Sequence, residues 1–407
     1  MRSTKKIFLL FSFFVTAHIL SAQYTWSPQV SGTNNNLYSV FFTTNSFNAA
    51  VNGFAVGTGG TIRTTSDFGS TWTGQVSGTI QTLYEVYFVN DSTGWISGGS
   101  GTILHTSDTG NTWTPQISNT TQTLWCIYFS SELYGFACGA GGTILATVDG
   151  GITWAPQTSN VTGNLWAVRM VNDSTGWMVG DNGVILKTTD YGANWNAQTS
   201  NVAGVLWSIT TDACNPGEAF ASGNGGAIIH TTDGGATWSP QTSGTGVFLH
   251  WISFDNPLCY GFVVGQSGEI RASADFGNTW NANTSNTTND LRSVFMTVPL
   301  DLLGWAVGDG GVIRVLQWPL GIHENEIQHI SVFPNPSDGK FIFDAGIVVA
   351  ENASVEIFDV LGNKIQNIHV NSTKAEIDLS GQPKGIYFYK FIVNGKISAT
   401  GKLMLSQ

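Results

Sequence analysis

The chain has 407 residues and a formal net charge of −11, and it is long enough for two or three domains with cores of their own. Residues 23–320 contain 18 acidic side chains but only six basic ones: Arg63, Arg169, Lys187, Arg271, Arg292 and Arg314. A segment so poor in cations cannot present the basic face that nucleic acids or anionic lipids require, so both are excluded as partners.

The first 22 residues have the pattern of a secretory signal peptide. Arg2, Lys5 and Lys6 form a basic start, an apolar run follows as far as Leu20, and small residues precede a cut after Ala22. We therefore expect an exported protein that is soluble or attached to a cell surface and is not held by a transmembrane helix.

A turn of the form Thr/Ser-x-Asp-x-Gly-x-Thr/Asn-Trp recurs six times, and the intervals between its Trp residues are 41 to 43 residues. The six turns contribute Asp67 and Trp72, Asp108 and Trp113, Asp149 and Trp154, Asp190 and Trp195, Asp233 and Trp238, and Asp275 and Trp280. One such Asp–Trp pair could serve as a sugar subsite. Recurrence at a fixed period favours a structural role instead, in which the Asp accepts from turn N–H groups and the Trp packs between repeats.

Each repeat contains four short β-type runs, which is the content of one propeller blade. Seven first runs can be counted, from "LYSVFF" to "LRSVFM", and prolines in the fourth runs place these at the outer edge of each blade. The seventh repeat lacks a fourth run, whereas the chain begins with an orphan one, "YTWSPQVSG". We predict an all-β protein: a seven-bladed β-propeller over residues 23–318, closed by its N-terminal strand, followed by a small Ig-like β-sandwich.

Four cysteines in an exported chain are compatible with disulfides. The hairpin positions of Cys126 and Cys138, and the matching loops of Cys214 and Cys259, predict the bridges 126–138 and 214–259. Buried or free thiols are the alternative.

Charged residues gather in blades 6, 7 and 1. Arg63, Arg271 and Arg314 share one repeat position, and the same sector holds Glu269, Asp290, Arg292 and Asp309. One interpretation is ion pairing between blades. The other is a substrate sector, either sialidase-like or with carboxylates such as Asp181 and Asp309 acting on a polysaccharide. No Cys/His cluster has metal-ligand spacing and no phosphate-binding loop is present, so neither a metal nor a cofactor is expected.

The box pattern resembles the Asp-box repeats of bacterial neuraminidases, known as BNR repeats. The region from Tyr24 to Trp318 resembles the propellers of the photosystem II stability/assembly factor family. That resemblance implies a protein-binding scaffold, whereas the different secretion architecture of this chain argues against a photosynthetic role.

The last 78 residues resemble the C-terminal sorting domain of the type IX secretion system of Bacteroidota. The resemblance covers residues 330–407, after a linker at 319–329, and its matching positions are Pro334, Asn335, Pro336, Gly339, Gly362, Gly385, Tyr387 and Lys402. It implies handling by the type IX machinery and delivery to the outer surface or medium of a Gram-negative bacterium, with possible attachment to surface lipid.

The sequence thus predicts an exported binding or scaffold propeller with a protein or glycan ligand. A secreted glycoside hydrolase is the alternative, and whether the protein is an enzyme stays open.

Overall fold

The computed structural model describes residues 25–44, 50–211, 217–254, 260–297, 303–317, 331–344, 353–360, 362–370, 372–393 and 396–406. The chain forms two compact units, Met1–Pro319 and Leu320–Gln407. The predicted signal peptide, the linker, Trp318, Cys214 and Cys259 lie outside the described residues.

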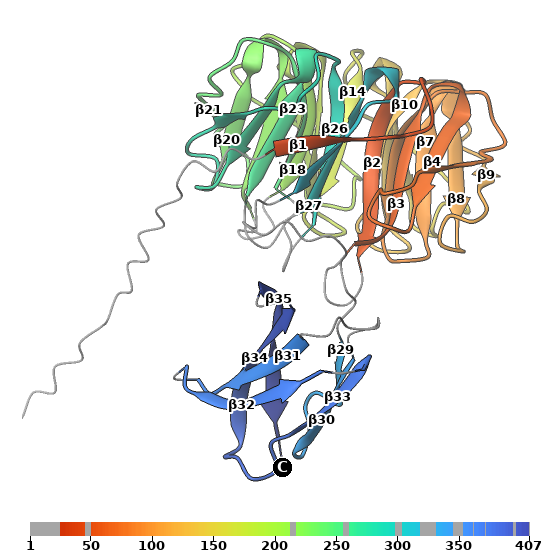
Figure 1. Ribbon diagram of the computed structural model, residues 1–407. Coiled ribbons are helices and arrows are strands. Elements are labelled where there is room, and N and C mark those ends of the chain that lie inside the picture. Colours follow the sequence, from red (N-terminus) through yellow and green to blue (C-terminus); the bar gives the residue numbers. More distant parts are fainter. Residues whose placement is uncertain are drawn as a thin grey trace, which may run out of the picture. The chain divides into compact units, whose positions relative to one another are not determined.

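The first unit consists of seven four-stranded antiparallel sheets, one for each predicted blade (Figure 1). Blades 1 to 3 contain β2 (Leu37–Thr44), β3 (Ala50–Gly57), β4 (Thr61–Thr65) and β5 (Thr73–Gln75); β6 (Leu83–Phe88), β7 (Gly94–Gly98), β8 (Ile103–Thr106) and β9 (Thr114–Gln116); and β10 (Leu124–Phe129), β11 (Gly135–Gly139), β12 (Ile144–Thr147) and β13 (Ala155–Gln157). Blades 4 and 5 contain β14 (Leu165–Met170), β15 (Gly176–Gly180), β16 (Ile185–Thr188) and β17 (Asn196–Gln198); and β18 (Leu206–Thr211), β19 (Ala219–Gly223), β20 (Ile228–Thr231) and β21 (Ser239–Gln241). Blades 6 and 7 contain β22 (Leu249–Ser253), β23 (Gly261–Gly265), β24 (Ile270–Ser273) and β25 (Asn281–Asn283); and β26 (Leu291–Thr297), β27 (Leu303–Gly308), β28 (Ile313–Gln317) and β1 (Thr25–Gln29).

Strand β1 completes the seventh blade, which confirms the predicted closure. It pairs antiparallel with β28, from Thr25 opposite Gln317 to Gln29 opposite Ile313, and the sheet order is β1-β28-β27-β26. The ring is therefore joined through a sheet made from both ends of the propeller sequence, and β28 is not left as an unpaired edge strand.

The first strands line the centre and are tied to one another around it. In blades 1, 2, 3, 5 and 7, the side chain two residues after the leading Leu accepts from a backbone N–H of the next blade. Ser39 Oγ accepts from Val86 N at 3.3 Å, and Ser208 Oγ accepts from Ile252 N at 3.3 Å. Ser293 Oγ accepts from Val40 N at 3.4 Å across the seam between blades 7 and 1.

Each Asp box closes the turn between the third and fourth strands. In blade 2, Asp108 Oδ1 accepts from Thr112 N at 2.9 Å and from Thr106 Oγ1 at 2.8 Å, while Thr106 Oγ1 accepts from Gly110 N at 3.0 Å. Hydrogen bonds from Thr112 lower the pKa of the Asp108 carboxyl. Trp113 packs edge-on against Phe88 of its own blade and Phe54 of the preceding one. Asp108 therefore stabilises the turn, and Trp113 packs between two adjacent blades.

The predicted 126–138 disulfide is absent. Cys126 and Cys138 are directly opposite each other on β10 and β11, as expected, but both are buried free thiols. Cys126 Sγ instead accepts from Val168 N of blade 4 at 3.3 Å, so it replaces the serine of the interblade tie. Burial, together with a hydrogen bond to the Cys138 thiol, raises the pKa of the Cys126 thiol well above its usual value.

The second unit has seven strands in two sheets. One sheet contains β29 (Ser331–Phe333), β30 (Lys340–Asp344) and β33 (Lys374–Asp378), and the other contains β32 (Lys364–His369), β31 (Ala353–Phe358), β34 (Gly385–Val393) and β35 (Lys396–Leu405). Phe341 and Phe343 of the first sheet share one buried core with Val355, Phe391 and Leu403 of the second. The two sheets thus form a sandwich, and its description as Ig-like stays a prediction.

Several residues of the sorting motif hold this sandwich together. Asn335 Nδ2 donates to Lys402 O at 2.7 Å and Asn335 Oδ1 accepts from Met404 N at 2.8 Å, so the Pro-Asn-Pro segment is fastened to β35. Tyr387 Oη donates to Pro383 O. A Cβ at Gly339 would lie 2.8 Å from Ser380 Cβ, which explains why the position requires glycine.

Candidate ligand-binding site at the mouth of the channel

One residue from each blade contributes to a ring at the mouth of the central channel. It is the second residue of each first strand, where the register with the second strand shifts by one residue. Such a bulge re-aims a side chain out of the regular alternation of a strand. The ring, which we call the collar, consists of Tyr38, Tyr84, Trp125, Trp166, Trp207, His250 and Arg292, all half-buried.

Six of the collar side chains form a continuous series of aromatic contacts. Ring centroids are 5.2 Å apart for Tyr38 and Tyr84, 4.5 Å for Tyr84 and Trp125, and 4.6 Å for Trp125 and Trp166. The series continues at 4.5 Å from Trp166 to Trp207 and at 5.7 Å from Trp207 to His250. His250 Nε2 then lies 3.2 Å from Nη1 of Arg292, the seventh member.

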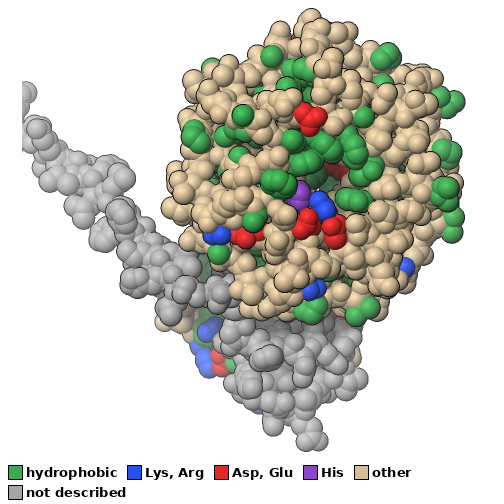
Figure 2. All heavy atoms as spheres, turned by 90° about the horizontal axis from the view of Figure 1, so that it is seen from above, with side chains coloured by type: hydrophobic (Ala, Val, Ile, Leu, Met, Phe, Trp, Pro, Cys, Tyr) green, Lys and Arg blue, Asp and Glu red, His purple; other side chains and the backbone are tan. Residues whose placement is uncertain are grey.

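Figure 2 shows a face of the propeller whose hollowed centre is surrounded by hydrophobic side chains, with a histidine and charged side chains gathered on one side of it. That distribution matches the collar, in which aromatic residues of blades 1 to 5 are followed by His250 in blade 6 and Arg292 in blade 7.

In blades 4, 5 and 7, the first residue of the turn between the second and third strands accepts a hydrogen bond from the collar side chain. Asp181 Oδ1 accepts from Trp166 Nε1 at 2.7 Å in blade 4, and Asn224 Oδ1 accepts from Trp207 Nε1 at 2.6 Å in blade 5. In blade 3 the equivalent residue is Ala140, and the buried Trp125 Nε1 has no hydrogen-bond partner among the described residues.

In blade 7 the supporting residue is Asp309, which binds Arg292 through both carboxylate oxygens. Arg292 Nε lies 3.0 Å from Oδ1 and Nη2 lies 2.7 Å from Oδ2, and Asp290 Oδ2 is 3.3 Å from Nη2. Burial and the nearby Arg292 charge lower the pKa of His250 to about 4, so this imidazole is neutral near pH 7. The sector formed by His250, Asp290, Arg292 and Asp309 is the charged side of the collar.

Below the collar, a buried ion pair fills the channel. Arg169 of blade 4 reaches Glu85 of blade 2, with Arg169 Nη2 3.3 Å from Glu85 Oε1. The Arg169 guanidinium carbon lies 5.2 Å from the centroid of the Tyr128 ring and 5.1 Å from that of the Trp251 ring. Side chains from blades 2, 3, 4 and 6 therefore meet at this level, and a ligand at the collar faces a floor.

The predicted charged sector divides into two groups. Asp290, Arg292 and Asp309 come together at the collar, but the three arginines that share a repeat position bind at blade edges. Arg314 donates to the backbone carbonyls of Ser285 and Asn286, both at 2.9 Å.

The other two arginines of that position behave in the same way. Arg271 pairs with Glu269 and donates to Gly244 O of the preceding blade at 3.1 Å. Arg63 donates to Trp72 O, and a Cβ on Gly32 of the seam would lie 2.3 Å from its Nη2. Asp181, considered as a carboxylate partner for Asp309, is occupied by Trp166 and by the backbone N–H of Asn164 at 2.9 Å.

His250 and the collar as a unit were missed by sequence reasoning. The signal was available in the aligned first runs, whose second letters are Y, Y, W, W, W, H and R. Trp251 also lies in a first run, one position later than Trp125, Trp166 and Trp207. The bulge sends that later position to the level of the ion pair.

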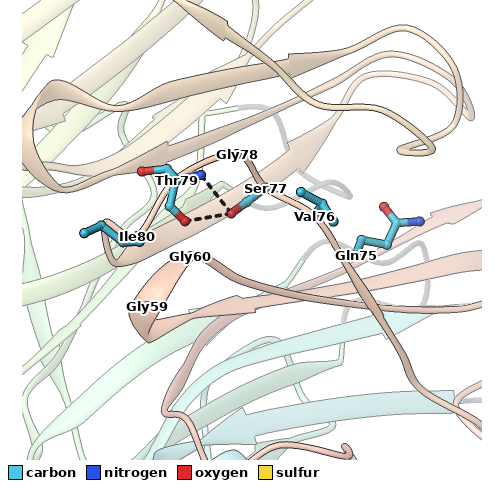
Figure 3. A pocket seen from close by; sticks show the side chains of 8 residues that line it. All are labelled: Gly59, Gly60, Gln75, Val76, Ser77, Gly78, Thr79 and Ile80. Carbon is cyan, nitrogen blue, oxygen red and sulfur yellow. Dashed lines mark hydrogen bonds between the residues drawn. The ribbon is translucent and has the colours of Figure 1, made fainter.

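A pocket near blade 1 is a weaker candidate. It is lined by Gly59, Gly60 and the segment 75–80 (Figure 3). Ser77 Oγ donates to Thr79 O at 3.1 Å and accepts from Thr79 N at 3.3 Å, a turn that recurs in the other blades, for example at Ser118. The pocket has no charged lining residue, so it offers a ligand fewer kinds of polar contact than the collar does.

Among the described residues, no group of three or more His, Cys, Asp or Glu side chains could hold a metal ion. Within the same part of the chain, no helix is long and apolar enough to cross a membrane.

Three solved propeller structures illustrate the similarity of fold. A structure titled "YCF48 bound to D1 peptide" has a TM-score of 0.60 and 18% identity, and the match covers 72% of this chain and 95% of that one. YCF48 from Cyanidioschyzon merolae has a TM-score of 0.59 and 17% identity, covering 72% and 98%. The WD40 propeller domain of Doa1 has a TM-score of 0.59 and 14% identity, covering 74% and 98%. No curated protein sequence matches the chain.

The fold and its C-terminal unit define the class of protein: an exported β-propeller delivered by type IX secretion to the outer cell surface or the medium, as in Bacteroidota. The secretion-system sorting-domain model matches residues 331–406. The model described as "Photosynthesis system II assembly factor YCF48" matches residues 19–118 and 116–249. The chain belongs to this YCF48 family and carries a secretion tail.

Proposed function

We propose that this protein is an exported binding module whose propeller holds a polypeptide ligand at the collar. The observation that carries the proposal is the continuous ring from Tyr38 to Arg292, in which aromatic surface and a charged sector meet at one half-buried place. Concave aromatic sites with a few convergent polar groups are the usual form of ligand sites.

A polypeptide is favoured over a glycan because the similar propeller titled "YCF48 bound to D1 peptide" holds a peptide. No photosynthetic partner is inferred, since this chain is exported by a different route.

The hydrolase alternative has less support. A sialidase-like site needs several arginines around a substrate carboxylate, whereas Arg63, Arg271 and Arg314 donate to backbone carbonyls at blade edges. Arg292 does reach the collar, but both of its nearby carboxylates are engaged with it.

The test is a peptide array and a glycan array probed with the mature protein and two variants. Trp166→Ala removes collar surface, and Phe276→Ala removes a side chain that is 55% exposed in the Asp-box turn of blade 6. We expect peptide signals that disappear with Trp166→Ala and persist with Phe276→Ala. Peptide signals unaffected by Trp166→Ala would refute the collar as the site, and collar-dependent signals on glycans alone would replace the polypeptide with a sugar.

A further inference from the structure

The charge at the collar is negative although an arginine stands in it. Asp290 and Asp309 bring two negative charges to the single positive charge of Arg292, and the neighbouring His250 is neutral near pH 7. Asp181 adds a further carboxylate behind Trp166. The propeller as a whole is short of cations, so no basic surface offsets this local charge.

Each nitrogen of Arg292 already has a partner, and of its five N–H groups one on Nη1 is left for a ligand. Its Nε and Nη2 donate to the two oxygens of Asp309, Nη2 is also 3.3 Å from Asp290 Oδ2, and Nη1 lies 3.2 Å from His250 Nε2. A ligand carboxylate could take only this single N–H without displacing a partner, and it would meet the two like charges of Asp290 and Asp309. An anion is therefore a poor match for the collar.

Building on the proposed function, we propose that the collar recognises a cationic side chain of its polypeptide ligand, the ammonium of a lysine or the guanidinium of an arginine. The carboxylates of Asp290 and Asp309 receive the charge, and the rings of Trp207, Trp166 and their neighbours line the approach. Cations are attracted to the faces of Trp and Tyr rings.

The two carboxylates keep capacity for such a ligand. Asp290 and Asp309 side chains are each 28% exposed. Besides Arg292, Asp290 Oδ1 accepts from Ser267 N at 2.9 Å. An ionised carboxylate has about four acceptor positions on its two oxygens, so further N–H donors can be accommodated.

An apolar aromatic lining next to carboxylates favours a long side chain with a terminal charge. The Arg169–Glu85 pair closes the channel beneath the collar, so a ligand enters from the open face and stops at that level. Lysine and arginine have aliphatic stems that pack on apolar surface while the charged end finds polar partners. An amine attached directly to a sugar ring lacks such a stem, which favours the polypeptide source.

The experiment is a calorimetric titration of the full mature protein with capped pentapeptides that have Lys, Arg, Gln or Glu at the centre and glycine elsewhere. Glucosamine and N-acetylglucosamine trimers form a glycan arm. We expect the Lys and Arg peptides to bind about tenfold more tightly than the Gln peptide, to lose affinity with added salt, and the Glu peptide to bind more weakly still.

Variants assign the effect to the collar. Asp290→Asn should remove most of the preference for Lys over Gln. Asp91→Asn, the same change at an exposed residue of the turn between β6 and β7, should leave that preference intact. Arg292→Gln should raise the affinity for the Lys peptide, because the carboxylates lose their internal cation; folding of each variant is checked by its thermal midpoint.

The outcomes separate this inference from the proposed function. Collar-dependent binding of the Glu peptide at least as tight as that of the Lys peptide, or loss of all binding in Arg292→Gln with a normal thermal midpoint, would overturn cation recognition and leave the collar as a peptide site. Preference for the glucosamine trimer over the Lys peptide would overturn the polypeptide source. Lack of binding by all of the cationic peptides would overturn the inference, while the arrays test the collar itself.

Discussion

Glu85 and Arg169 stand on first strands two blades apart and form a buried ion pair in the channel, with Arg169 Nη2 3.3 Å from Glu85 Oε1. Glu85 also performs the interblade task that serine performs elsewhere, since its Oε2 accepts from Ile127 N at 3.1 Å. Tyr128 and Trp251 cover the guanidinium from blades 3 and 6.

Neutralising one partner of this pair should destabilise the propeller strongly. Glu85→Gln leaves the buried Arg169 without its counter-charge, and breaking a buried pair in this way costs about 3–5 kcal/mol. Chemical unfolding followed by far-ultraviolet circular dichroism measures the loss.

A double variant provides the control for that prediction. Glu85→Ser with Arg169→Tyr installs residues that other blades use at the same positions, Ser39 and Tyr87. It should recover most of the stability, because a buried pair replaced as a whole is often neutral. Equal losses in the single and double variants would argue that the charges do not act as a pair.

His250 should make the protein less stable in mild acid. Its pKa falls from the ordinary 6.5 to about 4 in the folded protein because of burial and the charge of Arg292, opposed in part by Asp290 and Asp309. Below pH 6.5 the unfolded chain takes up a proton that the folded chain refuses, so stability falls as the pH drops from 6.5 to 4 and then levels off. The lost contribution is roughly 3 kcal/mol.

The comparison that isolates this effect is His250→Gln, which cannot titrate. The difference in unfolding free energy between variant and wild type should change over pH 6.5 to 4 and stay constant above pH 7. The other titrating groups, including the Asp-box carboxylates, are common to both proteins. A flat difference across the whole range would show that His250 is not held neutral.

Ala140→Asn should stabilise blade 3. The buried Trp125 Nε1 has no partner among the described residues, whereas Asn224 accepts from the equivalent Trp207 Nε1 at 2.6 Å. Supplying the acceptor should gain about 1 kcal/mol. The thermal midpoint reports the gain, and Ala140→Asn made together with Trp125→Phe should show none.

The propeller ring and its strand order could be predicted from sequence because both depend on a fixed period. Repeats of about 42 residues give the blades, prolines give the outer edge, and an orphan fourth run gives the closure by β1. These are properties of each repeat or of adjacent repeats, so linear order is sufficient to infer them.

The candidate site depended on geometry that linear order does not contain. Arg292 and Arg314 were assigned to one sector but lie on the first and third strands of blade 7, β26 and β28. The bulge after each leading Leu brings His250 beside Arg292 across 42 residues. For Cys126 and Cys138 the predicted register was right, but both thiols are free, and Cys126 Sγ accepts from Val168 N of the next blade.

An Asp-box tryptophan should contribute more to stability than any surface aliphatic. Trp113 is 8% exposed and contacts Phe54 and Phe88. Trp113→Ala should cost about 3–5 kcal/mol, whereas Val76→Ala, at a side chain that is 88% exposed, should stay within about 0.5 kcal/mol of wild type. Similar unfolding midpoints for both variants would show that packing of Trp113 between the blades does not stabilise the propeller.

Removing residues 330–407 should stop release of the propeller. The sorting-domain match covers this unit, which folds around its own core. Cell fractionation and immunoblotting should find the truncated protein in the periplasm, while an exposed change such as Val360→Ser is exported as wild type. Normal amounts of the truncated protein in the medium would refute the prediction.

The pairing of β1 with β28 has a consequence for the order of events during export. When the N-terminus of the chain leaves a translocon first, β1 emerges long before β28. Until β28 has emerged, β1 has no strand to pair with. Ring closure is then a late step, because β1 can pair with β28 only after the whole propeller sequence has emerged. Removal of β1 by proteolysis after folding would open the ring again.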